Sequence, residues 1–245
     1  MSWLAGKVVE NRHWTDALFS LRLEGVPIGF EAGQFVRIAL DMEEGNEETR
    51  VARPFSMVNP PHDPVLEFYG IVVPEGPLSP RLARLAPGDT LYVASNPAGF
   101  LVLSELPDAQ TLWLISTGTG IAPFLSIVRT EAPWRRFRNV VLVHAVRHAR
   151  ELVYREMIEA LPGIKYVRVV SREKDSGALA GRIPAALRDG RLEAAAGLEL
   201  SAATSQVMLC GNPDMLKDTS AALMERGMRK HRRRAPGHIT VESFW

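Results

Sequence analysis

The hydrophobic pattern of this 245-residue sequence changes near residue 108. Before that point apolar and polar side chains alternate, so that Phe19, Leu21 and Leu23 would share one face of a strand. The same alternation recurs between turns rich in proline and glycine, at residues 34–40, 51–58, 65–73 and 90–95. Short strands at this spacing predict an antiparallel β-barrel or sandwich.

Apolar runs that are typical of buried strands follow in the second half, at residues 111–116, 139–146, 165–171 and 206–211. Helical patterns lie between them, and residues 150–161 repeat apolar side chains four apart, as in Val153 and Met157. Alternating strands and helices predict a parallel sheet covered on both faces. We therefore expect an antiparallel β-barrel domain over residues 1–104 and a C-terminal α/β parallel-sheet domain over residues 105–245.

The composition excludes several classes of protein. Apolar residues make up 46% and the formal net charge is +1, which argues against nucleic acid as the main partner. The single cysteine, Cys210, excludes an internal disulfide, a four-cysteine zinc site and an all-cysteine iron–sulfur cluster. No apolar run approaches the roughly 20 residues of a membrane helix, and residues 1–14 lack a signal-peptide pattern. We expect a cytoplasmic, monomeric protein that binds neither nucleic acid nor membrane.

The segment ISTGTGIAPFLS, residues 115–126, ends a predicted strand and begins a predicted amphipathic helix. Ligands of parallel sheets bind beyond the carboxyl ends of the strands, and a helix start attracts anions. Gly118 and Gly120 would let the backbone approach a phosphate, and Pro123 suits the first helical turn. The pattern predicts a pyrophosphate site. The alternative is an ordinary strand–turn–helix connection, because the third glycine of a dinucleotide fingerprint and the lysine of a P-loop are both missing.

Three arginines follow later strands: Arg147, Arg172 and Arg182. Guanidinium groups suit phosphate oxygens, so arginines at neighbouring strand ends favour a site for the 2′-phosphate of NADP. An NAD site would more often place an acidic residue near the ribose. Each of the three is equally explained as a surface arginine.

Two further patterns are weaker. His144 and His148 are four apart, but they fall on a strand and just beyond its end without a carboxylate partner, so we predict no metal site. The basic run over residues 228–234 is offset by the acidic run over residues 43–48. The basic run is either a solvated surface segment or a docking patch for an acidic electron carrier.

Four motifs occur along the chain in this order: RPFS at residues 53–56, TGTGIAPFLS at 117–126, CGNP at 210–213 and VESFW at the end. With them the chain resembles the ferredoxin–NADP reductase family, and within it the bacterial flavodoxin/ferredoxin–NADP reductases. The resemblance covers essentially the whole chain. It implies an FAD-binding barrel and an NADP-binding α/β domain. It also implies an enzyme in which NADPH gives a hydride to flavin N5 and single electrons pass to ferredoxin or flavodoxin.

The resemblance assigns roles in FAD binding. Arg53 would pair with the FAD pyrophosphate, Phe55 would stack on the isoalloxazine, and the Ser56 hydroxyl would lie near flavin N5. The family usually has tyrosine where Phe55 stands, so stacking is kept while a hydrogen bond to the cofactor is lost. Further FAD contacts are implied for Pro54, Val72, Val73, Gly76, Leu78 and Ser79.

The resemblance also assigns the NADP half. The pyrophosphate turn falls on Thr117, Gly118, Thr119 and Gly120, and the 2′-phosphate site on Arg147, Arg172 and Arg182. Cys210 would lie beside the nicotinamide, although a small apolar residue ending a buried strand is an equal explanation. Glu242 would shuttle protons near the flavin. Phe244 would cover the isoalloxazine and Trp245 the adenine, or the two aromatics pack in the core.

Two other functions remain open at this point. One is a reductase component that supplies an oxygenase, and the other is a regulatory protein that binds flavin or dinucleotide without turnover. The joint presence of Ser56, Cys210 and Glu242 favours catalysis, because binding alone requires none of them.

Overall fold

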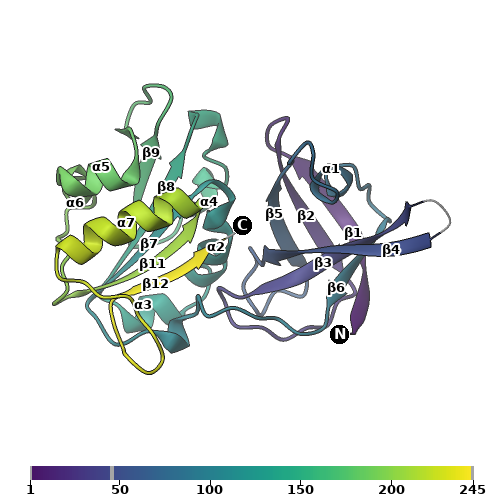
Figure 1. Cartoon of the computed structure of the whole chain (residues 1–245), viewed down its shortest axis with the longest axis horizontal. Coiled ribbons are helices and arrows are strands. Elements are labelled where there is room, and N and C mark those ends of the chain that lie inside the picture. Colours follow the sequence, from purple (N-terminus) through teal and green to yellow (C-terminus); the bar gives the residue numbers. More distant parts are fainter. Residues whose placement is uncertain (1, 45–46, 244–245) are drawn as a thin grey trace.

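The computed structural model describes residues 2–44 and 47–243, which form two domains that lie side by side (Figure 1). The first domain is a six-stranded antiparallel sheet with strand order β4-β3-β6-β1-β2-β5. Its strands are β1 (Trp3–His13), β2 (Leu18–Glu24), β3 (Phe35–Glu44), β4 (Glu47–Ser56), β5 (Leu66–Ile71) and β6 (Thr90–Ala94). A bridge between Met57 and Phe68 brings the two sheet edges together, which curls the sheet towards a barrel. The predicted antiparallel barrel is confirmed.

The alternating segments form strands for the expected reason. Phe19, Leu21 and Leu23 on β2 are buried in the barrel core. Ser20, on the opposite face of β2, is also buried, and its hydroxyl accepts from the Trp14 indole N–H at 3.2 Å. The long strand β1 was not predicted, since only Gly6 and Val8 along it are buried and the alternation is therefore weak.

The second domain is a six-stranded sheet with order β10-β9-β8-β7-β11-β12, and all of its strand pairs are parallel. Its strands are β7 (Thr111–Thr117), β8 (Asn139–Val146), β9 (Ile164–Val170), β10 (Leu179–Ala180), β11 (Ser205–Gly211) and β12 (Ile239–Ser243). The helices α2 (Ala122–Val128), α3 (Ala132–Arg136) and α4 (Arg155–Glu159) cover one face. The other face is covered by α5 (Ile183–Arg188), α6 (Arg191–Ala196) and α7 (Pro213–Glu225), as Figure 1 shows. The predicted parallel sheet, covered on both sides, is confirmed.

The short elements are α1 (Ser79–Leu82) and three 3-10 turns, η1 (Leu103–Glu105), η2 (Gly118–Ile121) and η3 (Ala149–Glu151). The connection between the domains includes η1, and the Arg136 guanidinium fixes it by donating to the carbonyls of Leu103 and Leu106. Within residues 2–44 and 47–243, no helix has the length and apolarity needed to span a membrane.

Helix α2 differs from the expected amphipathic helix, because all seven of its residues are buried. Phe124 and Val128 belong to the cluster that also contains Val58 and Tyr69 of the first domain. The Ser126 hydroxyl donates to the Asn59 carbonyl across the interface at 2.7 Å. The helix has no solvent face because each domain covers one of its sides.

The predicted helix over residues 150–161 is also wrong as a single element. It divides into η3 and α4, and between them Tyr154 has a left-handed φ of +60°. This conformation lets the Tyr154 ring lie 4.9 Å from Trp14 and lets its hydroxyl donate to Glu67 at 2.8 Å. Contacts with the first domain therefore override the local helical pattern.

Candidate functional site between the domains

A cavity of about 70 Å³ lies where β4 of the first domain meets β12 of the second. Both domains line it, with Phe35, Pro54, Ser56, Glu242 and Ser243. Among the described residues, Ser56 Oγ and Glu242 Oε1 are buried atoms without a hydrogen-bond partner. Buried polar atoms are normally paired. These two can therefore serve a polar ligand placed between the domains.

The Glu242 carboxyl group is suited to proton transfer. Burial raises the pKa of Glu242 to about 7, because its charged form loses hydration. Gly99 makes room for this side chain, since a Cβ atom at Gly99 would lie 3.0 Å from Glu242 Oε2. A carboxyl group that titrates near neutrality can both give and accept a proton.

Cys210 lies next to Glu242, because the two residues are partners in the parallel register of β11 and β12. The Cys210 side chain is fully buried. Burial raises the pKa of the Cys210 thiol well above its usual value, and the nearby Glu242 charge adds to the shift. A protonated thiol is a poor nucleophile. Cys210 is instead a small, polarisable core residue at the end of β11.

The two glycines of the turn after β7 are needed for different reasons. Gly118 has a φ of +53°, and a Cβ atom there would meet nothing within 4 Å. Its outer side is therefore open to a ligand. A Cβ atom at Gly120 would lie 2.6 Å from the Cys210 carbonyl oxygen. Gly120 is thus required for close packing of the turn against β11, whereas Gly118 fits the expected approach of a phosphate.

The CGNP motif, residues 210–213, holds this turn in place. Gly211 has a φ of +131°, and a Cβ atom there would overlap the Thr117 hydroxyl. The Asn212 backbone N–H donates to Thr117 Oγ1 at 2.9 Å. The Asn212 side chain also accepts from two backbone N–H groups in the first turn of α7. The motif therefore joins the turn after β7 to the start of α7.

The three arginines lie at one edge of the sheet. Arg147 directly follows β8, Arg172 follows β9 and Arg182 follows β10. The Arg172 N–H donates to the Arg147 carbonyl at 2.9 Å, so these two residues are adjacent. All three side chains are exposed. The structure thus brings together the cations that we expect at a 2′-phosphate.

Acidic side chains near these arginines bind the backbone rather than the guanidinium groups. Glu151 accepts from the N–H groups of Arg147 and His148 at 2.9 and 3.1 Å. Glu173 accepts from the Ala149 N–H at 2.6 Å and pairs with His148 Nδ1 at 3.2 Å. Within the described ranges, Arg147, Arg172 and Arg182 form no ion pair with a carboxylate. Their positive charge is therefore available to an anion.

The RPFS segment forms the end of β4. The Phe55 ring lies edge-on to Phe68, with ring centroids 6.4 Å apart. Gly70 is needed beside it, because a Cβ atom there would lie 3.0 Å from the Phe55 ring. Arg53 is exposed and donates to the Ala52 carbonyl at 2.8 Å.

The segment of residues 72–79 forms a closed turn. The Val73 N–H donates to Ser79 Oγ at 2.8 Å, which leaves the hydroxyl hydrogen of Ser79 free to donate. The Gly76 N–H already donates to the Val73 carbonyl at 2.8 Å. Leu78 is buried in the barrel core, while Val72 packs at its edge and Val73 is 51% exposed. These two hydrogen bonds and the buried Leu78 hold the turn in place, with the Ser79 hydroxyl and Val73 at its surface.

Known proteins resemble this chain both in its second domain and over its full length. Residues 114–221 match the family model described as an oxidoreductase NAD-binding domain. The flavodoxin/ferredoxin–NADP reductases of Shigella flexneri and Escherichia coli K12 are 49% and 48% identical over 249 residues, with 99% of each chain covered. The chain belongs to the flavodoxin/ferredoxin–NADP reductase family. A crystal structure of a ferredoxin NADP+ reductase from Neisseria gonorrhoeae with bound FAD and NADP matches it with a TM-score of 0.94 and 33% identity over the whole of both chains.

Two residues to which the reductase resemblance assigns a role lie outside the part of the chain that the structure describes. Phe244 and Trp245 follow the last described residue, Ser243, and their predicted roles at the flavin and adenine stay predictions. Thr119 is described and is buried in the turn after β7. The contacts of Gly70 and Gly99 were missed, because they depend on side chains distant in the sequence.

His144 and His148, which are four apart in the sequence, make separate contacts. His148 pairs with Glu173, whereas His144 is fully buried in β8 and contacts the Gly118 carbonyl. The described residues contain no group of three or more potential metal-ligating side chains.

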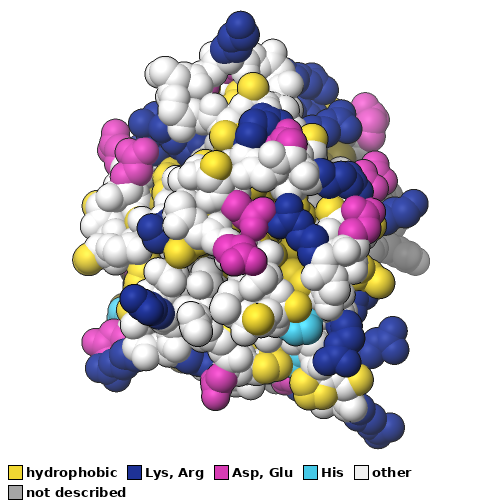
Figure 2. Space-filling view, turned by 90° about the vertical axis from the view of Figure 1, so that its left-hand side faces the viewer, with side chains coloured by type: hydrophobic (Ala, Val, Ile, Leu, Met, Phe, Trp, Pro, Cys, Tyr) yellow, Lys and Arg dark blue, Asp and Glu magenta, His cyan; other side chains and the backbone are white. Residues whose placement is uncertain are grey.

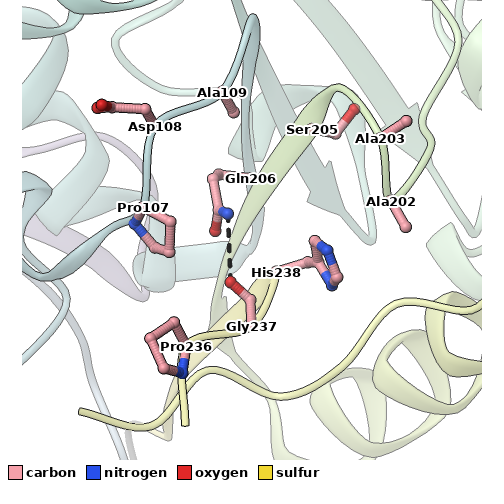
Figure 3. Close-up of a pocket in the computed structure, with 10 residues that line it drawn as sticks. All are labelled: Pro107, Asp108, Ala109, Ala202, Ala203, Ser205, Gln206, Pro236, Gly237 and His238. Carbon is pink, nitrogen blue, oxygen red and sulfur yellow. Dashed lines mark hydrogen bonds between the residues drawn. The ribbon is translucent and has the colours of Figure 1, made fainter. Parts of the chain in front are cut away.

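A second cavity, of about 190 Å³, lies at the opposite end of the parallel sheet (Figure 3). The segments before β7 and β12, together with the start of β11 and the residues before it, line this cavity. The Gln206 side-chain amide donates to the Gly237 carbonyl at 3.2 Å. The cavity is remote from the turn after β7, since it lies where the strands begin. It is therefore separate from the interdomain site.

Proposed function

We propose that this protein transfers electrons between NADP(H) and a one-electron carrier, ferredoxin or flavodoxin, with FAD as its cofactor. The observation that carries the proposal is the interdomain cavity, where Ser56 and Glu242 offer unpaired buried polar atoms to one ligand. Cys210 lies beside Glu242, and the phosphate-binding candidates follow strands of the same sheet. Membership of the reductase family supports the same activity.

FAD fits the residues of the first domain. Arg53 would neutralise its pyrophosphate, Phe55 would contact the ring, and Ser79 would donate to a phosphate. Ser56 Oγ would gain the partner that it lacks in the protein alone. The same segments supply Pro54, Val72, Val73, Gly76 and Leu78. When bound, FAD supplies the chemistry that links two-electron hydride transfer to one-electron transfer.

NADP(H) fits the carboxyl ends of the second sheet. The turn of residues 117–120 would hold the pyrophosphate on the open side of Gly118. Arg147, Arg172 and Arg182 would bind the 2′-phosphate and favour NADP(H) over NAD(H). The nicotinamide would then reach the end of β11, close to the buried and neutral Cys210.

Glu242 would hold or release a proton at the interdomain cavity. Its pKa of about 7 suits this role. Ser56 would orient the bound ring through its hydroxyl. Neither residue would carry the electrons, because FAD does so. The protein would position the FAD and NADP(H) rings and keep water away from them.

We further propose that the chain acts as a cytoplasmic monomer with a domain boundary between residues 104 and 105. This boundary lies inside the connection from β6 to β7. The outer face of the second domain carries interspersed cationic and acidic side chains (Figure 2). Such a mixture does not single out that face for a strongly charged carrier.

The test is an electron-transfer assay with the purified FAD-loaded protein. NADPH should reduce ferredoxin or flavodoxin at a rate that depends on carrier concentration, and Ser56→Ala should slow the reaction while FAD is retained. A protein that binds FAD and NADPH but reduces neither a carrier nor an artificial acceptor would be a binding protein, and the proposal would fail. Transfer to an oxygenase, with none to either carrier, would favour the oxygenase-supplying alternative.

A further inference from the structure

A chain of buried polar groups lies beneath the turn after β7. His144 on β8 is fully buried, and its Nε2 atom lies 3.3 Å from the Gly118 carbonyl oxygen. The His144 Nδ1 atom lies 3.4 Å from the Tyr166 hydroxyl on β9. The chain therefore runs from β9 through β8 to one peptide group of the turn that follows β7.

The acceptor at one end sets the direction of these bonds. A carbonyl oxygen can only accept, so His144 Nε2 carries the hydrogen and donates to Gly118. In a neutral ring Nδ1 then has a lone pair, which accepts from the Tyr166 hydroxyl. Burial lowers the pKa of His144 to about 4, so the ring stays neutral at physiological pH.

The bond to Gly118 also fixes the next amide. The peptide group between Gly118 and Thr119 is planar and trans. Its carbonyl and its N–H therefore point in opposite directions. With the Gly118 carbonyl directed at His144, the Thr119 N–H points away from His144 and from the strands beneath the turn.

We propose that His144 is a positioning residue for NADP(H), which aims the Thr119 N–H at the pyrophosphate by holding the Gly118 carbonyl. Tyr166 supports this role by holding His144 in one tautomer. The inference rests on the proposed placement of the pyrophosphate at residues 117–120. It explains why a polar, fully buried side chain is placed among the apolar residues of β8.

The experiment measures binding to the FAD-loaded protein by calorimetry, with two probes. NADP+ contains the pyrophosphate, whereas adenosine 2′-monophosphate reaches only the arginine site. His144→Leu removes the donor, and His144→Gln keeps an N–H donor at nearly the same place. Loss of one hydrogen bond should weaken NADP+ binding about fivefold in His144→Leu. His144→Gln should restore affinity to within about twofold, and adenosine 2′-monophosphate should bind equally to all three proteins.

Ser116→Ala is the matched control. The Ser116 hydroxyl is buried in β7 and donates to the Val143 carbonyl at 2.9 Å, so it makes a similar bond without touching the turn. This variant should bind NADP+ like the wild type. If His144→Leu does not fold, Tyr166→Phe decides, with an expected loss of about twofold for NADP+ alone. Unchanged NADP+ affinity in the decisive variant, or equal losses for both probes, would overturn the inference.

Gly118→Ala separates this inference from the proposed function. Its methyl group would occupy the open side of the turn, so NADP+ binding should fall if the pyrophosphate lies there. Loss in Gly118→Ala with none in His144→Leu would refute only the positioning role. No loss in Gly118→Ala would instead refute the placement of NADP at this turn.

Discussion

Cys210 and Glu242 are register partners on the neighbouring parallel strands β11 and β12, at the carboxyl end of the second sheet. Burial disfavours the charged form of both groups, and the Glu242 charge raises the pKa of the Cys210 thiol further. The thiol therefore stays protonated while the carboxyl group titrates near neutrality. Proton chemistry at this site falls to Glu242.

The raised pKa of Glu242 predicts a pH-dependent stability. Between its ordinary value of 4.5 and about 7, the folded protein holds this proton more tightly than the unfolded chain does. The contribution of Glu242 to the free energy of unfolding should therefore fall as pH rises through this window and level off above pH 7. Buried His144, whose pKa is lowered to about 4, contributes the opposite trend up to about pH 6.5, so the effect of Glu242 is the difference between wild type and variant. The pKa difference limits the effect to about 3 kcal/mol. Glu242→Gln should abolish it, as measured by urea unfolding at pH 5 and pH 8.

Glu199→Gln provides the control for that measurement, because Glu199 is exposed and the chemical change is the same. It should retain the wild-type difference between pH 5 and pH 8. An unchanged difference in Glu242→Gln would show that Glu242 is hydrated in solution.

Arg53→Ala should yield weakly flavinylated protein, since the substitution removes the cation proposed for the FAD pyrophosphate. Arg50→Ala is a matched control on the same strand, because the Arg50 guanidinium pairs with Asp41 at 2.6 Å. The measurement is the ratio of flavin to protein absorbance after purification. Wild-type FAD affinity in Arg53→Ala would refute the placement of the pyrophosphate at Arg53.

Arg147→Ala and Arg182→Ala should weaken NADPH binding while NADH binding changes little. Loss of one charge-assisted contact costs about 1.5–3 kcal/mol, or roughly tenfold to a hundredfold in affinity. Arg188→Ala is the control, since Arg188 on α5 pairs with Glu225 instead. Equal losses for NADPH and NADH would remove the two arginines from the 2′-phosphate site.

Tyr154→Phe should loosen the contact between the domains. The substitution keeps the ring against Trp14 and Tyr69 but removes the hydroxyl that donates to Glu67. A hydrogen bond to a charged acceptor contributes about 1.5–3 kcal/mol, and denaturant unfolding should show a loss of this size. Glu67→Gln should cost at least as much, because Glu67 also pairs with Arg129 at 3.4 Å and the substitution weakens both contacts. Equal stability of wild type and Tyr154→Phe would contradict the role of this bond.

The local sequence pattern predicted the strands whose side chains are buried at regular intervals along the chain. Residues 18–24 and 139–146 form β2 and β8 as expected, because apolar positions face a core on one or both sides. The strand β12 was missed, since Val241 is 39% exposed and only Ile239 packs firmly into the apolar core. A strand with so few apolar contacts gives a weak pattern.

The features missed by the sequence depend on contacts between the domains. Helix α2 is buried on all sides because Val58 and Tyr69 of the other domain cover it. Tyr154 interrupts a helical pattern to reach Glu67, which lies 87 positions earlier in the sequence. The pKa of Glu242 likewise follows from burial between the domains. The hydrophobic periodicity of a single segment cannot indicate which residues of the other domain will contact it.

The basic run of residues 228–234 contains one arginine with a structural role. Arg233 binds Glu105 and lies over the Phe100 ring at 4.3 Å, so it fastens this segment to the connection between the domains. Arg232 and Arg234 are exposed, and within the described part of the chain neither forms an ion pair. Arg232 and Arg234, together with the equally exposed Arg229 and Lys230, are therefore suited to attract an acidic carrier.

Charge reversal at Arg232 and Arg234 should slow the reduction of an acidic carrier, because long-range attraction speeds its encounter with the protein. The effect should be greatest at low salt and should shrink as the Debye length falls to about 8 Å near physiological ionic strength. NADPH oxidation with a small neutral acceptor should stay at the wild-type rate. Arg233→Ala should instead lower thermal stability, since it releases the contact with Glu105. A uniform loss of rate with both acceptors would mean that Arg232 and Arg234 act on folding or cofactor binding rather than on carrier encounter.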